Sequence, residues 1–148
     1  MNAVGIPGRI VPAVLADRWL GPVNTLILFV ILSGVLVYCW AAVHTLSGLW
    51  AFVIIYGFFG AGVQSLFPPA LGSLTPDLSK LGIRIGMVFS IISIGCLTGP
   101  PIAGAFIQAD HGDYLYAQMF GGSIMMFGAA LLIGGRLIRS GLHVLRKA

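Results

Sequence analysis

Arg9 is the residue of this sequence best suited to binding chemistry, because it is charged and lies inside an apolar segment. Placing an arginine at a membrane centre costs about 2.5–3.5 kcal/mol on translocon scales, so such a residue usually faces a cavity or a partner. A guanidinium binds a carboxylate through two parallel hydrogen bonds. Arg9 is therefore a candidate anion-binding residue. The simpler interpretation is that its side chain only extends to a nearby membrane interface.

Three further polar residues lie within apolar runs, namely Gln64, Ser65 and Ser90. They are candidates to line a substrate pathway, and tying helices together is an equally good interpretation. The sequence contains no glutamate, and all four aspartates lie in predicted loops or at predicted helix ends. General acid–base catalysis needs a titratable group, whereas arginine stays charged. These features argue against an enzyme, and no motif predicts a metal site or a cofactor.

Two sequence features are candidates for conformational gating. Asp17 and Arg18 are adjacent at the end of the first apolar segment, where an acid–base pair can hold a gate between helices. As an ordinary surface pair they would contribute only about 0–1 kcal/mol. Gly99, Pro100 and Pro101 lie in the middle of a later apolar run, and two prolines remove two backbone donors, so we expect a bend there.

The composition shows which environment must position these residues. Of 148 residues 58% are hydrophobic and 8% are charged, against about 25% charged in a soluble domain. Such a chain cannot coat a water-soluble surface, which excludes a soluble enzyme and a nucleic-acid-binding domain. Charged residues are absent from 19–76, 85–109 and 114–135. Because about 20 helical residues cross a bilayer, the first stretch must fold back and each of the others crosses once.

The sequence therefore predicts an all-α membrane protein with four transmembrane helices and a preceding partial helix. We expect spans at about 23–43, 48–71, 82–107 and 114–137 within a membrane region of 19–138. Residues 1–18 would form a truncated helix with the gating pair, and 139–148 a basic cytosolic tail. Seven of the eight basic residues fall on one side of this arrangement, which the positive-inside rule places in the cytosol. We expect an integral, multi-pass membrane protein, located in the plasma membrane rather than in an internal membrane.

Several motifs resemble fungal monocarboxylate-transporter-like proteins of the major facilitator superfamily. In chain order they are Asn2-Ala3-x-x-Ile6-Pro7-Gly8-Arg9-Ile10-x-Pro12-x-x-x-Ala16-Asp17-Arg18-x-x-Gly21-x-x-Asn24, Tyr56-Gly57-Phe58-x-x-Ala61-Gly62, Gly82-x-Arg84-Ile85-Gly86-Met87, Thr98-Gly99-Pro100-Pro101-Ile102-Ala103-Gly104 and Gly112-Asp113-Tyr114. The resemblance covers nearly the whole chain. It implies helices eight to twelve of a twelve-helix fold, whose two halves rock around a central site.

The resemblance also implies roles for the candidate residues. An arginine in the eighth helix of monocarboxylate transporters binds the substrate carboxylate, and Arg9 matches it. Asp17-Arg18 resembles a cytoplasmic gating motif, and Gly99-Pro100-Pro101 a motif of the eleventh helix. Animal members carry a carboxylate one turn before the arginine, where this chain has Gly5, so the resemblance does not extend to proton coupling.

The main hypothesis is thus an incomplete secondary transporter of small organic anions, such as monocarboxylates, working by alternating access. The expected partners are the lipid bilayer, the anion, and the missing N-terminal half or another transporter chain, with no nucleic acid. The alternative is a non-transporting membrane fragment that associates with other membrane helices, supported by the missing half and by small-residue faces on the predicted helices.

Overall fold

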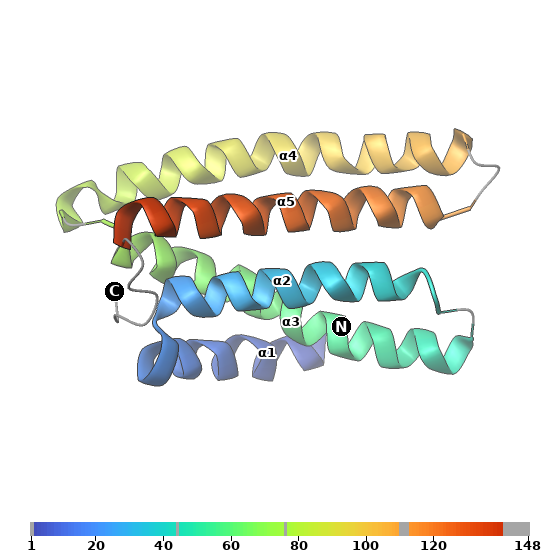
Figure 1. Ribbon diagram of the computed structural model, residues 1–148, viewed down its shortest axis with the longest axis horizontal. Helices are drawn as coiled ribbons and strands as arrows, with labels where there is room; N and C mark the ends of the chain where they lie inside the picture. The colour runs from blue at the N-terminus through green and yellow to red at the C-terminus, as the bar shows by residue number, and fades with distance from the viewer. Residues whose placement is uncertain (1, 44, 76, 110–112, 141–148) are drawn as a thin grey trace.

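The computed structural model describes residues 2–43, 45–75, 77–109 and 113–140, which are helical apart from short connections (Figure 1). The five α-helices are α1 (Asn2–Leu15), α2 (Pro22–Trp40), α3 (Leu46–Ser73), α4 (Leu81–Ala109) and α5 (Leu115–Ser140). A π-helical turn, η1 (Ala16–Leu20), follows α1, and a 3-10 turn, η2 (Leu78–Lys80), precedes α4. Most of the basic tail predicted at 139–148 lies outside the described residues.

Four of the helices are long and apolar enough to cross a membrane: Pro22–Trp40, Leu46–Ser73, Leu81–Ala109 and Leu115–Ile138. The remaining helix, α1, has 14 residues and spans about 21 Å at 1.5 Å per residue, less than a bilayer core of about 30 Å. The all-helical prediction, with four spans after a shorter helix, is confirmed.

The helices run side by side along one long axis (Figure 1). Helix α1 packs on α3, α3 packs on α2, and α2 also packs on α5. The main buried cluster joins η1, α2 and α3, and contains Ala16, Val23, Leu26, Phe29, Leu66 and Ala70. By contrast, α4 has no buried residue, and its Leu97 side chain is 78% exposed. Side chains this apolar are stable on a helix surface only where lipid or protein covers them.

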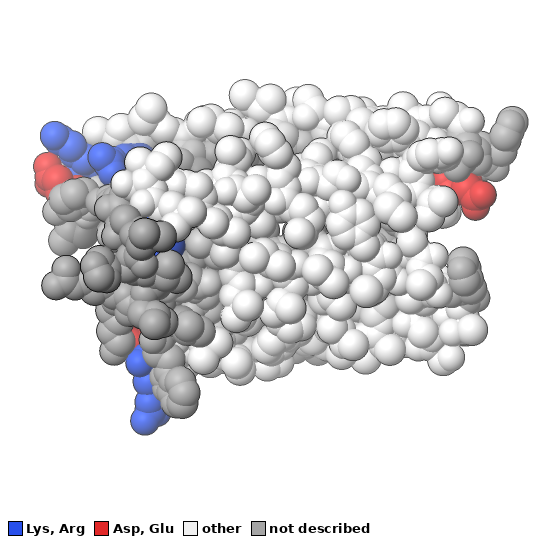
Figure 2. Space-filling model, viewed as in Figure 1, with Lys and Arg blue, Asp and Glu red and all other residues white. Residues whose placement is uncertain are grey.

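Apart from Arg9, which lies within α1, the charged side chains of the described residues lie near the two ends of the bundle. Figure 1 shows the end of η1, the start of α4 and the end of α5 at one end, and these segments carry Arg18, Lys80, Arg84 and Arg136. Figure 2 shows the blue basic atoms gathered at that end and a broad central region without charged atoms. Asp113 lies at the opposite end, just before α5. The charge distribution is that of a bundle crossing an apolar layer.

Local sequence signals set the starts of α2 and α3. Gly21 separates η1 from α2 with a φ of 77°, a left-handed conformation that glycine adopts without strain. Pro22 then occupies the first turn of α2, where its missing N–H costs nothing. Thr45 caps α3, because its Oγ1 accepts a hydrogen bond from the Gly48 N–H at 3.2 Å.

Candidate functional site

Arg9 and Gln64 form a hydrogen bond between α1 and α3. The Arg9 Nη2 donates to Gln64 Oε1 at 3.1 Å, and both side chains are exposed rather than packed in the core. Arg9 and Gln64 lie 55 residues apart in sequence, so the packing of α1 on α3 brings them together. A guanidinium has five N–H donors, and this is its single hydrogen bond to the described residues. Donors therefore remain for an anionic ligand.

Ser65 ties the same two helices together at the backbone. Its hydroxyl donates to the Gly62 carbonyl of its own helix at 3.0 Å, and it also lies 3.4 Å from the Arg9 carbonyl oxygen. The second distance is long for an O–H···O bond, so the proton serves mainly the nearer acceptor. The structure thus brings together three of the predicted substrate-binding residues, Arg9, Gln64 and Ser65.

Ser90, the fourth predicted substrate-binding residue, lies on α4. Its hydroxyl donates to the Gly86 carbonyl of its own helix at 2.8 Å. Within the described residues no hydrogen bond connects Ser90 to α1 or α3, so its part in a substrate site stays a prediction.

The predicted gating pair, Asp17 and Arg18, lies in the π-helical turn between α1 and α2. The wider turn is closed by the Gly21 N–H, which donates to the Ala16 carbonyl at 2.9 Å. Both charged side chains are exposed, and among the described residues neither forms an ion pair. The pair is therefore free to meet a neighbouring segment, and its role as a gate stays a prediction.

Gly99, Pro100 and Pro101 lie within α4, which continues from Leu81 to Ala109 without interruption. A methyl group added at Gly99 would meet no atom within 4 Å. The prolines therefore do not break the helix, and flexing at this point stays a prediction.

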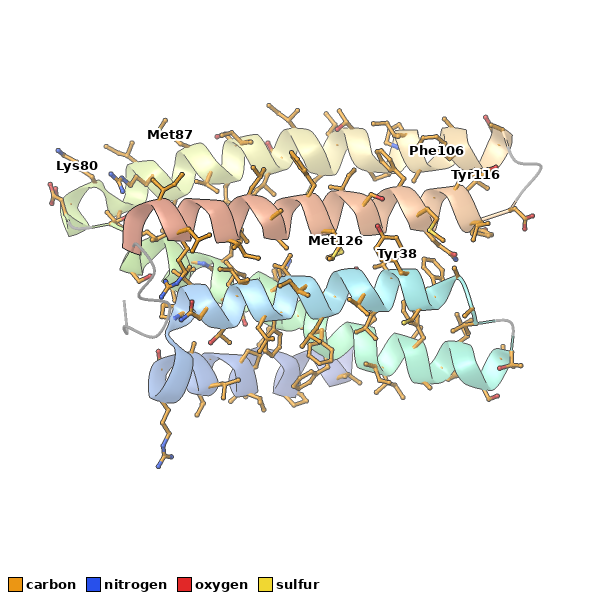
Figure 3. The ribbon with its side chains drawn as sticks, viewed as in Figure 1. Tyr38, Lys80, Met87, Phe106, Tyr116 and Met126 are labelled. Atoms are coloured by element: carbon orange, nitrogen blue, oxygen red, sulfur yellow. The ribbon has the colours of Figure 1, made fainter. Side chains whose placement is uncertain are left out.

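A polar contact between α2 and α5 was not anticipated from the sequence. The Tyr38 hydroxyl lies 3.0 Å from Ser123 Oγ, which itself donates to the Met119 carbonyl at 2.7 Å. Figure 3 shows Tyr38 and Met126 between α2 and α5. Gly122 makes room for the tyrosine ring, since a methyl group there would lie 2.9 Å from it. The sequence signal that could have indicated this contact is the pair Gly122-Ser123, a small residue beside a hydroxyl within a predicted span.

Several fungal transporters are similar to this chain in sequence. The chain is 39% identical over 137 residues to an MFS-type transporter of Gibberella zeae, covering 93% of this chain and 31% of that protein. It is 35% identical over 137 residues to the aspyridones efflux protein apdF of Emericella nidulans, covering 93% and 28%. It is also 33% identical over 148 residues to MFS-type transporter 1 of Ophiocordyceps sp., covering 99% and 32%. No family model and no solved structure matches the chain.

The chain spans about a third of the length of these curated relatives. They are transporters rather than enzymes, which agrees with the absence of a catalytic motif in the sequence. The protein is an integral, multi-pass membrane protein, because it has four apolar helices long enough to cross a membrane and its relatives are transporters. The chain is therefore homologous, along almost its whole length, to a part of fungal transporters of the major facilitator superfamily, and its helices form part of that fold.

Proposed function

We propose that this chain is the substrate-anchoring part of a secondary transporter that exports small organic anions, monocarboxylates or related metabolites, by alternating access. The observation that carries the proposal is the Arg9–Gln64 hydrogen bond of 3.1 Å. Arg9 would hold the substrate carboxylate, and the adjoining Ser65 hydroxyl would line the same region of α3.

The pairing with Gln64 gives the arginine a fixed orientation without neutralising it. The Gln64 amide oxygen accepts one hydrogen bond, but it carries no charge. The guanidinium therefore keeps its full positive charge for an incoming carboxylate. Two parallel N–H donors match the two carboxylate oxygens, an arrangement that a lysine ammonium cannot reproduce.

The relatives support the transport class and suggest its direction. The name of one of them describes the efflux of aspyridones, and the others are named as MFS-type transporters. We place the chain at helices eight to twelve of the twelve-helix fold, as its motifs suggest. The other half of the fold would supply the opposing wall of the cavity, and the plasma membrane is the proposed location.

The test is transport by the protein as it is expressed in its own organism, with any sequence beyond these 148 residues. Vesicles would be assayed with radiolabelled pyruvate and benzoate, and with benzamide as an uncharged relative of benzoate. Arg9→Ala should reduce anion transport by about a hundredfold, because the charge and its paired hydrogen bonds are both lost. Arg9→Lys should reduce it by about tenfold, because the charge stays but the second hydrogen bond is lost. Arg84→Ala, which removes a cation at the end of the bundle, is the matched control. Equal transport by all four proteins would refute the proposal.

The exposed α4 favours one alternative, a non-transporting membrane protein that associates with other helices. No residue of α4 is buried by the rest of the described chain. Co-purification of the 148-residue chain with an intact transporter, together with no transport of its own, would favour this alternative.

A further inference from the structure

We propose that Gly8 is a positioning residue for Arg9. Its missing side chain lets α1 approach α3 closely enough for the guanidinium to reach Gln64. This inference rests on the proposed role of Arg9 and adds a determinant of anion affinity that does not itself touch the anion.

The geometry at Gly8 leaves no space for a side chain. A Cβ atom added there would lie 2.7 Å from the Phe58 carbonyl oxygen, 3.1 Å from the Phe58 Cα and 3.3 Å from the Ala61 Cβ. The first two atoms belong to the α3 backbone, which cannot rotate away as a side chain can. Any substituent at position 8 must therefore separate the two helices by several tenths of an ångström.

The contact is specific to position 8 of α1. Gly5 lies one turn earlier on the same helix, and a Cβ there would meet only the Ala61 Cβ at an ordinary distance of 3.9 Å. Gly8 is buried, whereas the next residue, Arg9, is exposed. Of these two glycines, the one that α3 crowds is therefore the one directly before the arginine.

A small separation is enough to break the Arg9–Gln64 bond. At 3.1 Å it is within the usual range for N–H···O bonds, but such bonds are lost by about 3.5 Å. The Ser65 hydroxyl already lies 3.4 Å from the Arg9 carbonyl, so that contact has no margin. Widening the crossing at Gly8 would release both contacts and leave the guanidinium without a fixed orientation.

The experiment compares Gly8→Ala with Gly5→Ala in the full protein, measuring the apparent affinity for benzoate. Gly8→Ala should weaken it by about tenfold, the loss expected when one hydrogen bond to a charged group is no longer made. Gly5→Ala should change it less than about twofold. Thermal unfolding of each variant in detergent reports any general loss of stability. Equal affinity in Gly8→Ala and the unmodified protein would overturn the inference.

A double-mutant cycle with Gln64→Ala separates positioning from a general packing effect. If Gly8 acts through the Arg9–Gln64 bond, Gly8→Ala should cost little further affinity once Gln64 is alanine. The same fold-loss in both backgrounds would overturn the inference. Ala61→Val approaches the same contact from α3 and replaces Gly8→Ala if that variant does not fold. An Arg9→Ala protein of unchanged affinity would instead refute the proposed function itself.

Discussion

Gly62 is the position where the packing of this bundle makes the sharpest stability prediction. A methyl group there would lie 2.6 Å from Cδ1 and 2.7 Å from Cε1 of Phe29, and 2.9 Å from Cγ of Pro12. Neither neighbour can move freely. Pro12 is a rigid, fully buried ring, and the Phe29 ring packs against the Phe59 ring with centroids 5.2 Å apart. We therefore expect Gly62→Ala to be overpacked.

The magnitude follows from a comparison with Gly57 on the same helix, where an added methyl group would meet no atom within 4 Å. Replacing a helical glycine by alanine stabilises by about 0.8–1 kcal/mol at either position, so this gain cancels in the comparison. Overpacking costs about 1–3 kcal/mol and applies to Gly62 alone. Gly62→Ala should therefore be less stable than Gly57→Ala by about 1–3 kcal/mol.

Thermal unfolding followed by circular dichroism in detergent micelles measures this difference. At about 2–4 °C per kcal/mol for a protein of this size, the two variants should differ in Tm by about 2–12 °C, with Gly62→Ala lower. Gly57→Ala should unfold at or above the Tm of the unmodified protein. Equal Tm values for the two alanine variants would show that α1, α2 and α3 do not pack as closely as the structure indicates.

Two further predictions concern the loop before α4 and the orientation of the bundle. The Ser79 hydroxyl and N–H donate to the Asp77 carboxylate at 2.7 Å and 3.1 Å and lower its pKa below the ordinary 3.8. Their stabilisation is thus present above pH 3.8 and lost as the pH falls through the lowered pKa. Ser79→Ala should raise the pKa of Asp77 toward 3.8 in an NMR titration, and an unchanged pKa would contradict this. Separately, in a protein whose free Cys39 and Cys96 are replaced by serine, an impermeant maleimide added outside intact cells should label Thr45→Cys and spare Ser79→Cys. The reverse pattern would invert the proposed topology.

The four spans could be predicted from the sequence because charge and hydropathy along the chain are enough to locate them. Charge-free stretches longer than a bilayer crossing must be buried in lipid, whatever the helices pack against. The exact helix ends depend on local hydrogen bonds that hydropathy does not record. A start at Gly48 was expected for the second span, but α3 begins at Leu46 because Thr45 accepts the Gly48 N–H.

The candidate site was predictable in its members but not in its arrangement. Arg9, Gln64 and Ser65 stand out in the sequence because polar side chains are costly in lipid. That Arg9 bonds Gln64 depends on how closely α1 crosses α3, and this distance depends on Gly8. Ser90 was predicted for the same reason as Ser65, since both are serines in apolar runs. It lies on α4, however, and its hydroxyl bonds its own helix.

The way each polar side chain is satisfied explains which of them can serve a ligand. On α4, Ser90, Ser93 and Thr98 each donate to a carbonyl of their own helix, at 2.8, 2.8 and 2.9 Å. Their short side chains are satisfied locally, so a lipid environment costs them little. A guanidinium cannot be satisfied in this way, because its five donors lie far from its own backbone. Arg9 therefore needs acceptors from elsewhere. Gln64 supplies one, and in the function that we propose a bound anion would supply the others.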